Sequence, residues 1–415
     1  DLVRSRGLGD VYKRQYLGSG KYMTILFATT DYVIKGKPTT GLPAYLYRVS
    51  RALLDMGHTP IIMTFGHHDF YRKDDGIEVY TIYVPCFYYK NKCIGYICDA
   101  VSKSQIMNRR IEELSRRRYI DVIQFTSLMG LPLFYTGNIP AVLRLSSYAR
   151  IAFSTHISVD KTLAETMAFF ERCSVKRCTA VYAPCQSTAD QFGRDTHRKV
   201  YVLETPFQND VQCYDYSFAN QLKGKKYVFF FGILSPEKGI GVIAEILYQF
   251  LDAYKDYTFV FAGHPYEING INAHTLLRKC AKEYVNRVIL LKPLPHEQLY
   301  PVIMGAKFIV LPYFNDNLSN ACLEAMSFGK VVIGTDGGSF EQVIKHGYSG
   351  VLCQRNDSND LLDKLHYVMN LSDQEKREME KNAKQRMECL KPEVAVKKLV
   401  CFYKKVLYYR GQNKK

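Results

Sequence analysis

Short apolar runs, often β-branched or aromatic, alternate along the chain with longer stretches in which apolar residues recur every three or four positions. The first short runs lie at 23–28, 59–65, 121–125, 140–145, 179–183 and 199–203. A helix is expected over 42–56, because five apolar residues share one of its faces: Leu42, Tyr45, Leu46, Val49 and Leu53. Gly57 stands where a C-terminal cap would be. This alternation predicts βαβ units on a parallel sheet.

The same pattern restarts at residue 226. Strands are expected within 226–232, 257–263, 287–293, 307–313 and 330–335, and helices over 239–254, 272–284 and 319–328. Ser372 and Glu375 form an S-x-x-E capping box that predicts the start of a charged helix. The segment after Pro392 has one apolar face, so we expect this last helix to pack against another part of the molecule.

These patterns predict an α/β protein with two facing, doubly wound, Rossmann-like domains. The chain divides into a non-native or disordered leader, an N-terminal domain, an aperiodic linker, a C-terminal domain and a last helix with a basic tail, at 1–22, 23–206, 207–225, 226–390 and 391–415. The leader is set apart because its first fifteen or so residues match nothing downstream and look like a translated adaptor. Met23 is the expected natural start.

Composition excludes several classes of protein. Of 415 residues, 47% are hydrophobic and 23% are charged, which is typical of globular proteins and not of disordered, collagen-like or coiled-coil chains. The net charge of +16 favours anionic partners such as phosphates, lipid surfaces or nucleic acid. The longest apolar runs, such as 228–234, are far shorter than the roughly 20 residues of a membrane helix. We expect a cytoplasmic protein and leave open a peripheral contact with the inner face of the membrane.

Two familiar site patterns are disfavoured. The 12 cysteines include C-x4-C pairs at Cys93/Cys98 and Cys173/Cys178 but no C-x2-C, which favours buried thiols over a zinc site or a disulfide framework. Residues 18–21 read GSGK, like part of a phosphate-binding P-loop, but no strand precedes them and no Ser or Thr follows the lysine. No metal site is expected.

Two loops should line the crevice beyond the carboxyl ends of the strands, where ligands bind in such folds. Gly41 would let the backbone approach a ligand, and the helix that follows offers free N–H groups to an anion. A routine βα turn is the alternative. In the second half a strand ends at Gly232, and Lys238 stands just before the next helix. That lysine could stabilise negative charge on a diphosphate leaving group, or could simply be solvated.

A third loop carries two carboxylates. Asp316 lies just before a predicted helix, and Glu324 follows eight residues later, about two turns into that helix, so both can face the crevice. Carboxylates accept hydrogen bonds from pairs of hydroxyls, and a helix N-terminus attracts an anion. The pair suits a ligand that is part sugar and part phosphate. The alternative is an N-cap Asp and a paired Glu in the core.

Residues 312–352 resemble the nucleotide-sugar signature of GT-B glycosyltransferases, in particular the retaining family four, whose E-x7-E motif here has Asp316 and Glu324 at its ends. The GILSPEKG segment at 232–239 and Gly57-His58 share the resemblance, which covers most of 23–410. It implies the GT-B fold, with the C-terminal helix crossing back to the N-terminal domain.

The resemblance also implies an activity, the metal-independent transfer of a sugar from a UDP- or GDP-linked donor with retained anomeric configuration. The acceptor would be a glycan or a lipid-linked molecule bound by the N-terminal domain, in the synthesis of a surface polysaccharide or lipopolysaccharide. The nucleotide sugar is a substrate, and no cofactor is implied.

The family's pattern assigns roles to residues at the donor site. Glu324 would hold the ribose hydroxyls, Asp316 the hydroxyls of the donor sugar, and Lys238 the diphosphate, so that Lys238 and Asp316 are the expected catalytic residues. Backbone N–H groups near Asn317 and Leu318 would assist. Gly232 would belong to the same site, and Gly41 would mark where the N-terminal loop nears the donor phosphate. Glu341 is expected either to be structural or to support the residues that touch the donor.

The chain departs from this pattern at two places. Ile233 stands where the family commonly has an arginine that pairs with the lysine on the diphosphate, and Arg144 or Arg150 is the candidate to replace it. The usual N-domain histidine is missing, and the segments there offer polar residues instead: Gln124, Ser146 and Ser147. A non-catalytic GT-B scaffold or partner subunit that binds nucleotide is therefore the alternative function. Nucleic-acid binding is disfavoured because the basic residues are dispersed and form no recognised motif.

Overall fold

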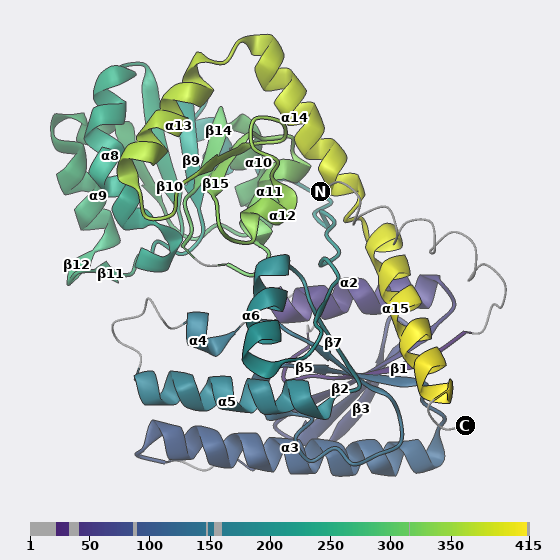
Figure 1. Ribbon diagram of the computed structural model, residues 1–415. Helices are drawn as coiled ribbons and strands as arrows, with labels where there is room; N and C mark the ends of the chain where they lie inside the picture. Colours follow the sequence, from purple (N-terminus) through teal and green to yellow (C-terminus); the bar gives the residue numbers. More distant parts are fainter. Residues whose placement is uncertain are drawn as a thin grey trace.

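The computed structural model describes residues 22–32, 41–85, 89–146, 148–152, 160–314 and 316–412, so nearly all of the expected leader at 1–22 lies outside it. Each half of the chain forms one β-sheet with helices packed on its faces, and the two halves lie one above the other (Figure 1). The α/β fold class predicted from the sequence is confirmed.

The N-terminal half contains an eight-stranded sheet in the order β3-β4-β2-β1-β5-β6-β7-β8, in which β3 alone runs antiparallel to its neighbour. Its strands are β1 (Thr24–Ala28), β2 (Thr59–Gly66), β3 (Phe70–Asp74), β4 (Ile77–Tyr83), β5 (Val122–Thr126), β6 (Ala141–Arg144), β7 (Ala180–Ala183) and β8 (Tyr201–Val202). The helices are α2 (Gly41–Asp55), α3 (Lys92–Arg117), α4 (Ala149–Ala152), α5 (Lys161–Arg177), α6 (Gln186–Thr196) and the 3-10 turn η1 (Leu128–Gly130).

Local chemistry explains the first βαβ unit. The apolar face of α2 is buried, as its spacing predicted, and Gly57 has a positive φ of 81°, the left-handed conformation that ends helices. The amide of His58 donates to Leu53 O at 2.9 Å, which closes the last turn before β2 begins. The short β3–β4 hairpin and the 26-residue helix α3 were not predicted.

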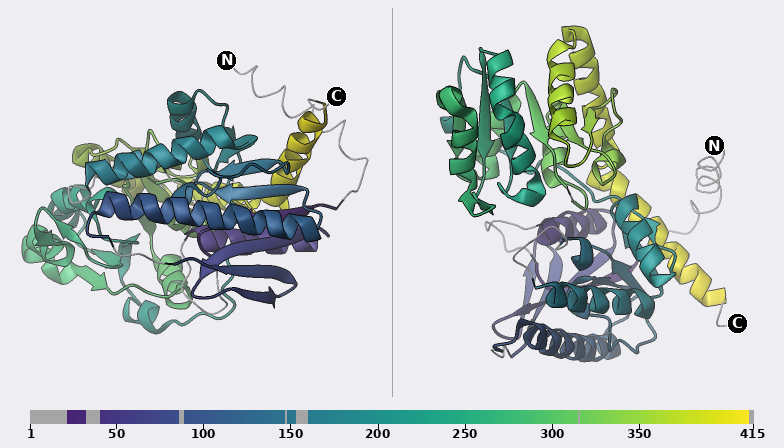
Figure 2. Two further views of the ribbon diagram at one scale, coloured as in Figure 1. Left: turned by 90° about the horizontal axis from the view of Figure 1, so that it is seen from below. Right: turned by 60° about the vertical axis from the view of Figure 1, so that its left-hand side comes forward.

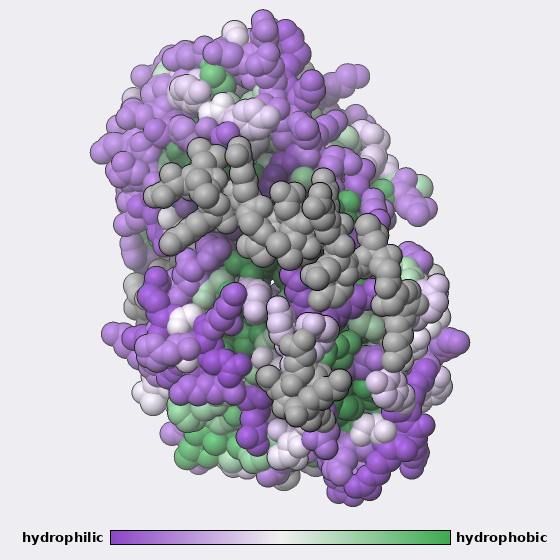
Figure 3. Space-filling view, turned by 45° about the vertical axis from the view of Figure 1, so that its right-hand side comes forward, coloured by the Kyte–Doolittle hydropathy of each residue, from purple (hydrophilic) through white to green (hydrophobic). Residues whose placement is uncertain are grey.

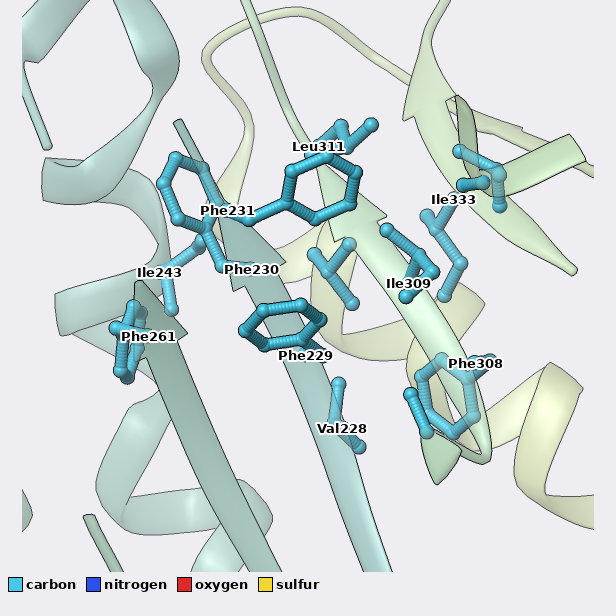
Figure 4. Close-up of a cluster of buried hydrophobic side chains, with 14 of the residues drawn as sticks. Val228, Phe229, Phe230, Phe231, Ile243, Phe261, Phe308, Ile309, Leu311 and Ile333 are labelled. Atoms are coloured by element: carbon cyan, nitrogen blue, oxygen red, sulfur yellow. The ribbon is translucent and has the colours of Figure 1, made fainter. Parts of the chain in front are cut away.

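The C-terminal half contains a fully parallel six-stranded sheet in the order β13-β10-β9-β14-β15-β16. Its strands are β9 (Lys226–Phe231), β10 (Tyr257–Ala262), β13 (Val288–Leu291), β14 (Phe308–Leu311), β15 (Val332–Thr335) and β16 (Val351–Cys353), and a separate hairpin joins β11 (Glu267–Ile268) to β12 (Ile271–Asn272). Figure 4 shows why β9 reads as an unbroken apolar run, since its side chains are covered on both faces of the sheet.

The helices of this half surround the sheet. They are α7 (Ser217–Gln221), η2 (Pro236–Lys238), α8 (Ile240–Ala253), α9 (Ala273–Ala281), η3 (Lys282–Arg287), α10 (His296–Gly305), α11 (Asn320–Ser327), α12 (Phe340–Val343), α13 (Ser358–Asn370) and α14 (Asp373–Glu388). The capping box predicted at Ser372 and Glu375 is present at the start of α14.

The last helix, α15 (Pro392–Gln412), leaves the upper half and packs against α2 of the lower half, as the yellow ribbon in Figure 2 shows. Its buried face adds Val396, Leu399 and Tyr403 to the core beneath α2. Tyr403 donates a hydrogen bond to Gln124 Oε1, which also accepts from Tyr182 at 2.8 Å. Gln124, one of the polar residues present where the usual N-domain histidine is missing, is thus buried and bonded to α15 and β7.

The chain crosses between the halves twice, at the linker and again just before α15. The amide of Phe207 in the first crossing donates to Leu390 O in the second at 2.8 Å, so the two crossings lie side by side. The linker predicted at 207–225 contains the short helix α7.

The surface is mainly hydrophilic on the face shown in Figure 3, and the hydrophobic side chains visible there gather mostly in its lower half. Among the residues that the structure describes, no helix is long and apolar enough to cross a membrane.

Candidate functional site

A pocket of about 390 Å³ lies between the two halves, in the crevice where the strand order predicted a ligand. Five of its lining residues belong to the N-terminal half: Ser146, Tyr148, Ser187, Thr188 and Gln191. The C-terminal half contributes the loops that follow β9, β14 and β15, together with Arg355 after β16. Of the residues predicted for the donor site, three line this pocket, namely Lys238, Asp316 and Asn317.

Two glycines shape the loop that presents Lys238. Gly232 ends β9 with a φ of 128°, and Gly239 has a φ of 71° at the start of α8. A Cβ at Gly239 would lie 2.1 Å from Pro312 O, so only glycine lets this loop approach the end of β14. The amide of Phe314 donates to Glu237 O at 2.8 Å and fixes the two loops together.

Lys238 and Asp316 meet because β9 and β14 are neighbouring strands. Lys238 Nζ lies 2.8 Å from Asp316 Oδ2 and 4.0 Å from the ring centroid of Tyr313, whose hydroxyl donates to Phe231 O. Both charged side chains are about three-quarters buried. The lysine is thus held at the pocket by an ion pair and a cation–π contact, and its ammonium is oriented before a ligand binds.

Asn317 connects the two halves of the molecule. Its side-chain amide donates to Ser146 O, and its Oδ1 accepts a hydrogen bond from Thr188 Oγ1 at 2.8 Å. Its backbone N–H donates to Asp316 Oδ1 at 2.9 Å, so this N–H already has a partner. The sequence pointed to Asn317 only as a donor-site residue and gave no sign of this bridge across the cleft.

Glu324 lies apart from this pocket, and the expectation that it sits two turns into the helix is wrong. Ser319 caps α11, which begins at Asn320, so residues 316–319 are not helical and Glu324 is about one turn in. Its side chain is largely buried, and Oε1 lies 3.3 Å from Nε2 of His296 at the start of α10. Neighbouring Leu318 is also buried.

Gly41 lies against the same region from the other half. A Cβ built on Gly41 would be 3.7 Å from Asn320 Nδ2, an ordinary contact, so the first described residues of α2 and α11 lie close together across the cleft. The positive end of a helix dipole favours an anion near such a point. The geometry is suitable for an anion.

The structure answers where a second cation could come from. Arg144 is buried, donates to Ser146 Oγ and Thr205 Oγ1, and lies over the ring of Tyr45. Arg150 pairs with Glu165 and Asp195 on the surface. Neither is among the described residues that line the pocket, so the expectation that one of them replaces the arginine missing at Ile233 gains no support.

Arg355 is the arginine that does line the pocket. Its Nη2 donates to Gly337 O at 2.6 Å, over the turn that Glu341 closes by accepting from the Gly337 amide at 2.8 Å. No motif marked Arg355, because it follows the short edge strand β16 at a distance of more than one hundred residues from Lys238. Ser146 lines the pocket, whereas Ser147 lies outside the described residues.

Among the described residues, no group of three or more His, Cys, Asp or Glu side chains is arranged to hold a metal ion. The eleven cysteines that the structure describes are free thiols. The charged side chains described so far at the pocket are those of the ordered Lys238, Asp316 and Arg355.

This architecture is the GT-B fold. The structure superposes on sucrose-phosphate synthase from Thermosynechococcus elongatus with a TM-score of 0.70 and 15% identity, covering 93% of this chain and 100% of that one. It also superposes on Anabaena Alr3699/HepE in complex with UDP and glucose, with a TM-score of 0.66 and 16% identity over 92% of this chain and 98% of the other. At these identities the likeness shows the fold.

A family model matches part of the sequence. Residues 215–386, about two fifths of the chain, match the family described as Glycosyl transferases group 1, which confirms the resemblance noted in the sequence.

Curated relatives align over shorter lengths. A putative glycosyltransferase, YtcC, of Bacillus subtilis is 27% identical over 231 residues, covering 54% of this chain and 52% of the relative. A D-inositol 3-phosphate glycosyltransferase of Corynebacterium urealyticum is 27% identical over 153 residues, covering 36% of each chain. The chain thus spans about half or less of the length of the curated relatives it matches.

Proposed function

We propose that this protein is a retaining glycosyltransferase that moves a sugar from a UDP- or GDP-linked donor to a glycan or lipid-linked acceptor. The observation that carries the proposal is the Lys238–Asp316 pair, held in a pocket between two Rossmann-like domains. A lysine ordered in this way is suited to an anionic leaving group. The proposal includes metal independence and a hexosyl donor.

In this proposal each side chain acts on one part of the donor. Lys238 turns from Asp316 to the diphosphate and stabilises the negative charge that develops on it as the bond to the sugar breaks. Asp316 then accepts hydrogen bonds from the sugar hydroxyls, and Glu324 does so from the ribose. The facing N-termini of α2 and α11, near Gly41, support the phosphates.

The proposed donor and the proposed acceptor rest on different observations. A UDP donor is favoured because HepE, which shares the fold, is described in complex with UDP and glucose and with UDP-glucose. For the acceptor we propose a role in surface polysaccharide or lipopolysaccharide synthesis at the cytoplasmic face of an anionic membrane. Arg116 and Tyr119, exposed at the end of α3, support peripheral contact with such a surface.

The first test is ligand binding. The protein is melted with UDP, GDP, ADP or CMP, each with and without Mg²⁺, because a ligand that binds only the folded state raises the melting temperature. We expect a rise of a few degrees with UDP or GDP that does not require Mg²⁺. Release of nucleoside diphosphate from the matching nucleotide sugars is then measured by chromatography.

A second candidate function is a non-catalytic GT-B scaffold that binds nucleotide. The observation in its favour is Ile233, half-exposed in the pocket where the family has an arginine. Stabilisation by a nucleotide without any release of nucleoside diphosphate, across a panel of acceptors, would identify the scaffold. A lack of stabilisation by every nucleotide would contradict both functions.

A further inference from the structure

His296 faces Glu324 from a separate helix. It is the first residue of α10, directly after Pro295, and its Nε2 lies 3.3 Å from Oε1 of Glu324 on α11. No sequence motif joins the two residues, which are 28 positions apart. The contact joins the N-terminal ends of two helices, α10, which follows β13, and α11, which follows β14.

The imidazole is held in place by its own helix. Tyr300 lies four residues further along α10, and the two rings are stacked with centroids 5.1 Å apart and an interplanar angle of 18°. Tyr300 is itself buried and packs against Phe328 at 5.0 Å. A swing of His296 away from Glu324 would break the ring stacking, so the stacking favours the observed direction of Nε2.

Charged groups from three elements surround the ring. Glu324 on α11 and Glu297 on α10 favour the imidazolium, whereas Arg48 of α2, reaching from the other half, opposes it. The hydrogen bond with Glu324 is the largest influence and raises the pKa of His296 above its ordinary value, although partial burial lowers it. His296 therefore keeps its positive charge to a higher pH than an exposed histidine.

We propose that His296 is a positioning residue that orients the Glu324 carboxylate toward the ribose hydroxyls of the donor. A carboxylate that gives Oε1 to His296 keeps Oε2 free to accept from a hydroxyl. The imidazolium also supplies an opposite charge beside the largely buried carboxylate of Glu324. This inference rests on the proposed function, because it takes the ligand at Glu324 to be a nucleotide sugar.

The first part of the test needs no ligand. The imidazole resonance of His296 is followed by NMR as the pH rises, and is identified by its loss in His296→Gln. We expect it to titrate above the ordinary histidine pKa in the wild type and to move back toward that value in Glu324→Gln. An unchanged titration in Glu324→Gln would show that the pair does not exist in solution.

The second part measures the affinity for UDP-glucose by calorimetry between about pH 6 and pH 8.5. UDP-glucose has no phosphate group that titrates in this range, so a change in affinity reports on the protein. We expect the wild type to bind several-fold more tightly at the lower pH, and His296→Gln, whose amide can bond Glu324 but does not titrate, to show a flat profile. His296→Ala should weaken binding at low pH by about fivefold, which corresponds to one net hydrogen bond.

A ribose analogue and a control variant complete the design. UDP-glucose lacking both ribose hydroxyls should bind wild type and His296→Ala alike, because the contact at stake is absent. His197→Asn is the matched control, since His197 is exposed at the end of α6 in the left-handed conformation that asparagine tolerates. Its pH profile should match the wild type.

The outcomes separate the inference from the proposed function. Identical pH profiles in wild type and His296→Gln, with UDP-glucose bound by both, would overturn the positioning role alone. If neither protein binds any nucleotide sugar, the proposed donor is wrong and the positioning role is lost with it. Equal melting temperatures of wild type and His296→Gln ensure that altered binding does not reflect unfolding.

Discussion

The two walls of the cleft differ in chemistry. Among the described residues that line the pocket, the N-terminal wall offers only neutral side chains with hydroxyl or amide groups, such as Ser187 and Gln191. The C-terminal wall contributes all of the charged ones: Glu237, Lys238, Asp316 and Arg355. Ionic groups suit a diphosphate, whereas hydroxyls and amides suit a neutral sugar or acceptor. Charged interactions with a ligand therefore come from the C-terminal half, whereas the N-terminal half contributes shape and uncharged hydrogen-bonding groups.

The largest expected effect follows from removing the ordered cation of the charged wall. Lys238→Ala should lower donor turnover by about 100-fold or more, as expected when one preorganised electrostatic stabiliser is lost. Release of nucleoside diphosphate from the donor measures this. Lys226→Ala is the control, because Lys226 starts β9, the strand that leads toward Lys238, but pairs with Asp256 on the surface. Equal turnover in the two variants would remove Lys238 from the reaction.

A buried carboxylate in the N-terminal half gives the second-largest expected effect, which is on stability. Glu171 of α5 accepts a hydrogen bond from the amide of Ala149, next to the wall residue Tyr148, and burial raises its pKa to about 8. The folded state therefore favours the protonated acid, and stability is lost as the pH rises from the unfolded pKa, near 4.5, toward 8. Glu171→Gln should remove that loss.

We expect the wild type to melt at a progressively lower temperature than Glu171→Gln as the pH approaches 8, with a final gap of roughly 5 °C. Thermal melting followed by circular dichroism at several pH values measures the gap. Glu165→Gln serves as the control, since Glu165 is exposed and should leave the pH profile unchanged. A constant gap at every pH would contradict the role of ionisation.

The attachment of α15 to the N-terminal half gives a smaller expected effect on stability. Tyr403→Phe removes one donor to Gln124 Oε1, which keeps its bond from Tyr182, so the cost should be about 1 kcal/mol. Urea unfolding measures it, and exposed Tyr409→Phe should cost nothing. A loss of several kcal/mol would mean that the whole buried cluster depends on this one hydroxyl.

The smallest effect concerns the bridge between the walls. Thr188→Val keeps the shape of the side chain but removes the hydroxyl that donates to Asn317 Oδ1. Because the bond from Asn317 to Ser146 O remains, we expect the KM for the donor to rise only about twofold to fivefold, with kcat unchanged. Thr166→Val on α5 is the control. A larger loss than in Lys238→Ala would reverse the contrast between the two walls.

The sequence was most informative where local rules decide the structure. The capping box at Ser372, the cap at Gly57 and the glycines around Lys238 are local features, and each stands where its residue type indicated. The apolar runs likewise predicted the positions of the parallel strands, because strands buried on both faces need an unbroken apolar sequence.

The features that the sequence did not predict depend on contacts between distant segments. His296, Arg355 and the bridge made by Asn317 join elements whose approach is set by strand order and by the placement of the two halves, not by spacing along the chain. The same holds for Gln124, whose strand was expected but whose partner on α15 lies 279 residues away. The spacing between Asp316 and Glu324 also misled, because the four residues from 316 to 319 form a loop rather than a helix.

The paired crossings at Phe207 and Leu390 have a mechanical consequence. The two chain segments that cross between the halves are tied to each other by a hydrogen bond. This tie restricts sliding and separation of the halves more than it restricts rotation about the tie. α15 continues the second crossing and packs against α2, which anchors that crossing on the lower half.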